Sequence, residues 1–227
     1  MKRDQRPLRA VPAWLWISLA FLLAAQLAWR AAQPQPRPAA ADLSRPPAAH
    51  TLRLASLGEP EAGARLVMLY LQAYEQRELD YARLVGWLQA ILDLDPLSQY
   101  PLFAAARVYA ETADAARSRI ALEFVYRAFF ADPDRRWPWL AHAALLAKHR
   151  LKDLPLARRY AAAVDRYTRS PDVPLWAKQM EVFILEDMGE LDAARIMLGG
   201  MLESGAIKDP AEARFLQQRL KELERRR

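Results

Sequence analysis

The segment Gly189-Glu-Leu-Asp-Ala-Ala-Arg-Ile-Met-Leu198 holds the clearest sign of the architecture, because it joins a turn glycine to a helical stretch with an Ala-Arg pair. That pair stands at 194/195 and also at 82/83, 116/117 and 157/158. Prolines mark a matching period, since Pro96, Pro133, Pro171 and Pro210 are 37, 38 and 39 residues apart. A period of about 40 residues with helical composition predicts stacked helix pairs.

The sequence from residue 52 onward predicts an all-α domain. Sustained alternation of apolar and polar residues is missing there, and apolar residues recur at i, i+3 and i+4 between breakers. Each of the four prolines is expected where one helix ends or the next begins. We predict four helix pairs and a C-terminal capping helix, over residues 60–76, 79–93, 99–112, 115–131, 137–150, 153–168, 174–188, 190–204 and 210–225.

The same segment resembles the tetratricopeptide repeat family. Gly189 matches the glycine between the two helices of a repeat, Ala194 the small residue five positions later, and Leu198 the bulky residue four further on. The resemblance covers roughly residues 60–209 and places Ala82, Ala116 and Ala157 at the same close-packing position. It implies a degenerate, lengthened α-solenoid that binds peptides or proteins in a concave groove.

An apolar segment near the N-terminus predicts a membrane anchor over residues 10–30. Residues 10–29 contain no charge, and a helix of that length matches the ~30 Å hydrocarbon core of a bilayer. Trp14, Trp16 and Trp29 lie near the two ends, where indole rings favour the membrane interface. A cleaved signal peptide is the alternative, but Trp29 and Arg30 spoil the small-residue pattern that cleavage needs.

The flanks of the anchor predict its orientation and a spacer. The tail 1–9 carries Lys2, Arg3, Arg6 and Arg9, whereas Arg30, Arg37 and Arg45 are spread over a longer stretch. This bias predicts a cytoplasmic tail and a periplasmic C-terminal domain at the inner membrane. Five prolines between residues 31 and 51 predict an extended linker. The helical domain is then expected over 52–227.

Composition excludes several classes of function. The formal charge of +6 divides into +5 for residues 1–50 and +1 for residues 51–227, so the domain is nearly neutral and nucleic-acid binding is not expected. The sequence has no cysteine, which removes disulfides, thiol nucleophiles and zinc-thiolate sites. Arg outnumbers Lys 27 to 6 in an Ala-rich chain, which is typical of a GC-rich bacterial genome.

No residue pattern points to catalysis, a cofactor or a metal. The glycines are scattered and form no phosphate-binding loop. His142 and His149 share a helix face but lie about 10.5 Å apart along its axis, which is too far to bind one metal ion together. The third histidine, His50, falls in the expected linker. We therefore expect a protein that is not an enzyme.

The stretch from residue 135 to residue 142 predicts a binding surface, because tryptophans beside arginines can recognise a partner through aromatic and cationic contacts. The alternative is that Trp137 and Trp139 pack the start of a helix against the preceding repeat while both arginines face solvent. The candidate partner-binding residues are Arg135, Arg136, Trp137, Trp139 and His142.

Two functions are consistent with these patterns. The first is a membrane-anchored scaffold or adaptor that binds a protein partner in envelope assembly, secretion or maturation. The second is an accessory or enzymatic subunit that acts on periplasmic glycans through an aromatic-lined groove. The second requires Trp137 or Trp139 to be exposed in a groove with carboxylates opposite, whereas a scaffold does not.

Overall fold

The computed structural model describes residues 12–32, 43–74, 79–205 and 207–225 and shows an all-helical chain, with no strand among these residues. The predicted all-α class is confirmed. The chain divides into two compact units, Met1–Ala41 and Asp42–Arg227. The basic tail 1–9 and linker residues 33–42 lie outside the described residues.

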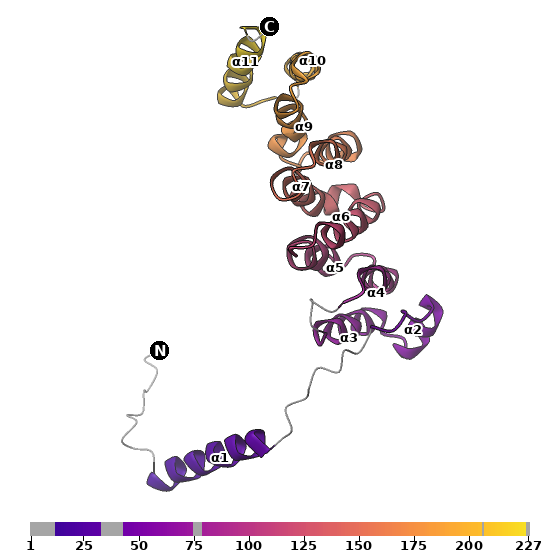
Figure 1. Ribbon diagram of the computed structural model, residues 1–227, viewed down its shortest axis with the longest axis vertical. Helices are drawn as coiled ribbons and strands as arrows, with labels where there is room; N and C mark the ends of the chain where they lie inside the picture. The colour runs from indigo at the N-terminus through magenta and orange to yellow at the C-terminus, as the bar shows by residue number, and fades with distance from the viewer. Residues whose placement is uncertain (1–11, 33–42, 75–78, 206, 226–227) are drawn as a thin grey trace, which may run out of the picture. The chain divides into compact units, whose positions relative to one another are not determined.

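The first unit contains helix α1, Ala13–Ala32, which corresponds to the predicted anchor (Figure 1). Its residues 13–30 have a mean hydropathy of 1.3, and none of them is buried inside the protein. By length and composition α1 can cross a membrane.

The second unit contains every helix expected between residues 60 and 225, with ends shifted by a few residues, and one further helix before them (Figure 1). The start of α7 shifts by four residues, because Pro133 takes the first helical position, which its fixed φ suits. The elements are α2 (Ala49–Ala55), α3 (Pro60–Gln72), α4 (Tyr81–Leu94), α5 (Tyr100–Ala104) with its π-helical continuation η3 (Ala105–Tyr109), α6 (Ala115–Phe129), α7 (Pro133–His149), α8 (Leu154–Tyr167), α9 (Leu175–Asp187), α10 (Leu191–Glu203) and α11 (Pro210–Arg225).

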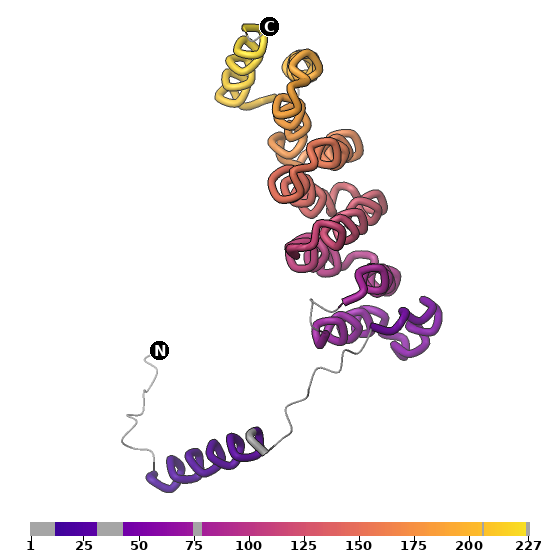
Figure 2. Tube along the Cα trace, in the orientation of Figure 1, coloured from indigo at the N-terminus to yellow at the C-terminus, as the bar shows by residue number. Residues whose placement is uncertain are grey.

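Helices that follow one another in the sequence pack against one another. Contacts join α3 with α4, η3 with α6, α6 with α7, α7 with α8, α8 with α9, α9 with α10 and α10 with α11. Figure 2 shows the helices of this unit in chain order from α2 to α11. One apolar core extends from Leu43 to Ile184, and a second joins α9, α10 and α11. Pro96, Pro133, Pro171 and Pro210 all lie at junctions between helices, as expected.

The helical unit begins earlier than the sequence predicts. Leu43 is buried, and its carbonyl oxygen accepts a hydrogen bond of 2.9 Å from the Arg83 guanidinium. The Ser44 carbonyl accepts one of 2.7 Å from the Trp87 indole. The expected linker 31–51 therefore ends in a strap, residues 43–48, that packs on α4. Proline prevents a helix there, but it does not prevent packing.

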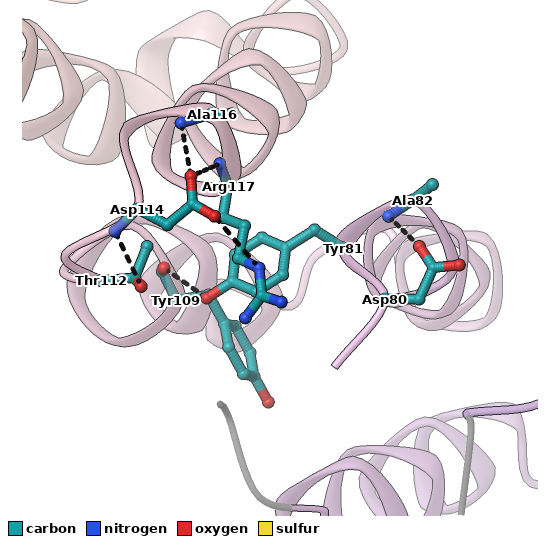
Figure 3. Close-up of polar contacts among 8 residues, drawn as sticks. All are labelled: Asp80, Tyr81, Ala82, Tyr109, Thr112, Asp114, Ala116 and Arg117. Carbon is teal, nitrogen blue, oxygen red and sulfur yellow. Dashed lines mark hydrogen bonds and ion pairs between the residues drawn. The ribbon is translucent and has the colours of Figure 1, made fainter. Parts of the chain in front are cut away.

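Aspartate caps define the starts of two helices and overturn part of the predicted repeat register (Figure 3). The Asp80 carboxylate accepts from the amide of Ala82 at 2.8 Å, and the Asp114 carboxylate accepts from that of Ala116 at 2.9 Å. Both alanines are exposed in the first turn of a helix. They are not close-packing residues, so that expectation is wrong for these two positions.

In the second helix of every helix pair, the residue four positions after the N-cap is buried. The caps are Asp80, Asp114, Asp153 and Glu190. In α8 and α10 this buried position falls on the alanine of the Ala-Arg pair, whereas in α4 and α6 it falls two residues beyond that alanine. The residues that occupy it are Leu84, Ser118, Ala157 and Ala194, all 0% exposed.

Contacts around Tyr81 join the first two helix pairs (Figure 3). The Tyr81 hydroxyl donates a hydrogen bond of 2.9 Å to the carbonyl oxygen of Tyr109. The Arg117 guanidinium lies over the Tyr81 ring, 5.6 Å from its centre, and also pairs with Asp114 at 3.4 Å. Arg117, in the first turn of α6, therefore contacts both the capping residue of its own helix and the first residue of α4.

Candidate functional site

The two arginines of the predicted binding stretch lie in different environments. Arg136 is only 3% exposed and donates to the carbonyl oxygens of Ala128 and, at 2.7 Å, Pro96. Arg135 is half-exposed and pairs with Asp132 at 3.7 Å. The idea that both arginines face solvent is therefore wrong for Arg136, because its guanidinium satisfies carbonyl groups at two helix ends.

The two tryptophans contact opposite neighbours of α7. The Trp139 indole donates to the Gln99 side chain at 2.7 Å, and its ring meets Phe103 edge-on at 5.6 Å, so Trp139 packs toward the preceding pair. Trp137 instead meets Trp176 of α9 edge-on at 5.6 Å. Both rings are partly buried. The structure therefore does not bring the two tryptophans together on one binding surface.

His142, the fifth predicted residue, is a largely buried histidine. Its side chain is 21% exposed, and its Nε2 lies 3.9 Å from the Glu111 carboxylate. Burial lowers the pKa of His142, as does the Arg107 charge, while Glu111 opposes the shift. His142 is therefore neutral at pH 7. Among the described residues no group of three His, Asp or Glu side chains is arranged to hold a metal ion.

A groove of about 480 Å³ lies where α3, α4 and the start of α5 meet. The buried side chains of Met68 and Ile91 contribute to its apolar lining. Gln72 on α3 donates a hydrogen bond of 2.8 Å to the Tyr100 hydroxyl, which joins two sides of the groove. Leu69, which is 61% exposed, lines it from α3. We call this feature the α3–α5 groove.

Apolar side chains continue outward from the α3–α5 groove. Leu66, on the same helix as Leu69, is 67% exposed. Tyr100 stacks on Phe103 at 5.8 Å, and Phe103 contacts Trp139, so an aromatic row leads from the groove to α7. Trp139 is thus the one predicted residue that is continuous with the groove.

The sequence contains a signal for this groove that the repeat pattern does not reveal. Residues 66–71 read Leu-Val-Met-Leu-Tyr-Leu, six apolar residues in succession. A helix of 3.6 residues per turn cannot bury such a run on one face, so part of it must stay exposed or contact a partner. In the structure Leu71 and Met68 are buried while Leu66 and Leu69 face outward.

No family model, curated protein or solved structure matches the chain.

Proposed function

We propose that this chain is a membrane-anchored adaptor whose helical domain is a degenerate tetratricopeptide-like solenoid that binds a protein partner. The α3–α5 groove is the observation that carries the proposal. Its lining combines the apolar side chains of Met68, Leu69 and Ile91 with polar ones from Arg65, Gln72, Asp95 and Ser98. An apolar strip with polar groups beside it suits an amphipathic helix, and the exposed Leu69 is available to contact its apolar face. The alternating pairs from α3 to α10, with α11 as a cap, support the solenoid.

The contacts in the groove favour protein binding over glycan binding. A glycan site needs Trp137 or Trp139 exposed opposite carboxylates, but both rings are partly buried. Trp137 packs on Trp176, and Trp139 packs on Phe103 and donates to Gln99. The groove itself offers leucine and methionine side chains, which bind apolar residues of a partner through burial of surface. Protein capture is therefore the function that this geometry supports best.

The anchor gives such an adaptor its working location. We place α1 in the inner (cytoplasmic) membrane as a single-pass helix, with the N-terminus in the cytoplasm and the helical domain in the periplasm. The four basic residues in the first nine positions support this orientation. Tethering restricts the groove to a layer near the membrane, which raises its effective concentration toward membrane-bound partners during envelope assembly, secretion or maturation.

Photo-crosslinking in intact membranes tests the function. A photoreactive amino acid at position 69 of the full chain should give an adduct with one partner, which mass spectrometry identifies. The affinity of that purified partner for the full chain in nanodiscs is then compared between the wild type and Leu69→Asp, which places a charge at the apolar rim. We expect binding to weaken at least about tenfold, the effect of losing about 1.4 kcal/mol.

The matched control is Ile196→Asp, because Ile196 is equally open to solvent on α10. This substitution should leave the affinity unchanged. An equal loss from both substitutions, or none from Leu69→Asp, would contradict binding in the α3–α5 groove.

A further inference from the structure

The charge of the helical domain is concentrated in its middle third. Residues 115–169, which comprise α6, α7 and α8, contain twelve basic and five acidic residues, giving +7. Residues 51–114 contain five and nine, giving −4, and residues 170–227 contain nine and eleven, giving −2. The near-neutral total of the domain therefore conceals a cationic centre between two acidic flanks. Such a field attracts anionic partners.

Part of this charge lies on a surface where tyrosines and arginines interleave, which we call the Tyr/Arg surface. The Arg159 guanidinium on α8 lies 4.5 Å from the ring centre of Tyr126 on α6. Tyr126 meets Phe130 edge-on at 5.0 Å, and Phe130 meets Tyr167 edge-on at the same separation. The surface consists of Arg119, Tyr126 and Arg127 from α6, Phe130 directly after α6, and Arg159, Arg166 and Tyr167 from α8.

The Tyr/Arg surface is hollowed in two adjoining places. One hollow, of about 360 Å³, is lined by Tyr126, Arg166 and Tyr167, and the small, buried residues Ala162 and Ala163 also line it. The other, of about 410 Å³, is lined by side chains that include Arg119 and Arg127. Arg159 lines both hollows, so they form one continuous surface. Its length along two helices suits a peptide segment.

The arginines of the surface fall into two groups. Arg119 pairs with Asp153 at 2.6 Å, and Arg159 pairs with Glu123. Arg127 and Arg166 are exposed, and within the described part of the chain neither has a carboxylate at ion-pair distance. These two side chains can therefore bind carboxylates of another molecule without breaking a contact of the protein.

We propose that the Tyr/Arg surface binds an acidic segment of a partner protein. In this complex Arg127 and Arg166 bind Asp or Glu carboxylates, and the exposed ring of Tyr167 contacts an apolar side chain between them. Glu123 and Asp153 lie among the arginines and would repel the closely spaced phosphates of a nucleic acid, whereas a peptide can space its carboxylates between them. This surface is separate from the α3–α5 groove, and its binding does not depend on the groove.

Fluorescence anisotropy tests the proposal with the full chain in nanodiscs of zwitterionic lipid. The probe is a short labelled peptide of repeating Glu-Ala-Leu units, and the reference peptide has Gln in place of Glu. We expect the Glu peptide to bind and the Gln peptide not to bind. Raising the ionic strength from about 0.05 to about 0.3 M should weaken it because exposed charges are screened. The double substitution Arg127→Gln with Arg166→Gln should weaken binding about tenfold, and Tyr167→Ala several-fold.

A charge-matched control separates this surface from the general field of the protein. Lys208→Gln with Lys221→Gln removes two exposed positive charges elsewhere and should leave the affinity nearly unchanged. Equal loss in both double variants, equal binding of the Gln peptide, or tighter binding of duplex DNA than of the Glu peptide would each overturn the proposal. Salt-sensitive dimers that lose their stability in Arg127→Gln would overturn it as well, since an acidic flank of a second copy would then be the ligand.

A separate substitution distinguishes the two proposals. Leu69→Asp should leave binding of the Glu peptide to the Tyr/Arg surface unchanged, although it disables the α3–α5 groove. Loss of peptide binding in Leu69→Asp would place the peptide in the groove and so contradict the assignment to α6 and α8.

Discussion

The guanidinium of Arg136 on α7 donates a hydrogen bond of 2.7 Å to the carbonyl oxygen of Pro96, a residue 40 positions earlier in the chain. The same side chain donates to the carbonyl oxygen of Ala128 near the end of α6. One buried arginine therefore ties the turn after α4, the end of α6 and the start of α7. Carbonyl groups at the ends of helices have no hydrogen-bond donor within their own helix, and Arg136 supplies that donor.

Replacing Arg136 with Leu should destabilise the protein. The substitution leaves the buried carbonyl group of Ala128 without a donor, which costs about 1–3 kcal/mol, whereas Pro96 is exposed and its carbonyl group can bind water instead. We expect the free energy of unfolding to fall by about 1–3 kcal/mol in urea denaturation followed by far-UV circular dichroism. Arg135→Leu is the control, because Arg135 is half-exposed and should change stability by less than about 0.5 kcal/mol. Similar losses in both variants would show that Arg136 has no special role.

The sequence predicts the junctions well because proline acts locally. A proline in a helix interior removes a backbone hydrogen bond, so Pro96 and Pro171 favour breaks, although Pro138 is accommodated inside α7. The burial of Arg136 is not a local property. Arginine is almost never fully buried, and only the three-dimensional meeting of three chain segments supplies the carbonyl groups that make burial favourable.

Ser118→Ala should stabilise the protein. Ser118 is fully buried in α6, four residues after the N-cap, and its hydroxyl has no hydrogen-bond partner among the residues that the structure describes. Removing an unsatisfied buried hydroxyl should raise the free energy of unfolding by about 1 kcal/mol. Thr168→Val provides the opposite case, because the buried Thr168 hydroxyl donates to the Val164 carbonyl at 2.8 Å. Thr168→Val should therefore lower the free energy of unfolding. If both substitutions raised it, or both lowered it, this account would be contradicted.

The position of Ser118 also explains why the Ala-Arg pair predicts the register incompletely. In α4 and α6 an aspartate stands two residues before the alanine and caps the helix, so the alanine falls in the exposed first turn. In α8 the cap is Asp153, four residues before Ala157, and the alanine is buried. Identical residue pairs thus occupy different helical positions, because the cap sets the start.

The strap before α2 should contribute measurably to stability. Leu43 is 1% exposed, and replacing it with Ala removes buried methyl groups and leaves a cavity. We expect a loss of about 2–4 kcal/mol in chemical denaturation of the full chain. Leu54→Ala, at an exposed position on α2, is the control and should have little effect. If the wild type and Leu43→Ala were equally stable, the strap would not belong to the folded domain. The domain would then begin at residue 52, as the sequence predicts.

The candidate binding surfaces were harder to predict than the helices. The stretch around Trp137 has the composition of a recognition site, yet its side chains form contacts within the protein, because aromatic and arginine residues serve cores and interfaces alike. The Tyr/Arg surface is assembled from segments 30 to 40 residues apart, such as Tyr126 and Arg166. The sequence indicates this surface only when the net charge is counted separately for each third of the domain. The positive middle third and the two acidic flanks nearly cancel in the total charge.

His142 should make stability depend on pH between about 7 and 5. Its pKa in the folded protein lies below the ordinary value of about 6.5, because burial and the Arg107 charge disfavour the protonated ring. The unfolded state therefore binds more protons in this range. The stabilisation is present above the unfolded pKa and is lost as the pH falls through the folded pKa, with a slope of at most about 1.4 kcal/mol per pH unit.

Urea denaturation at several pH values measures this contribution, and His142→Gln removes the titrating group. The variant should show a flatter dependence than the wild type between pH 7 and 5. Leu145→Gln is the matched control, since it changes an exposed side chain of the same helix without removing a titratable group. The carboxyl groups of Asp134 and Asp153, whose pKa values are lowered by backbone hydrogen bonds, lose their stabilisation below about pH 4, outside this window. An unchanged slope in His142→Gln would show that this histidine is not the group responsible.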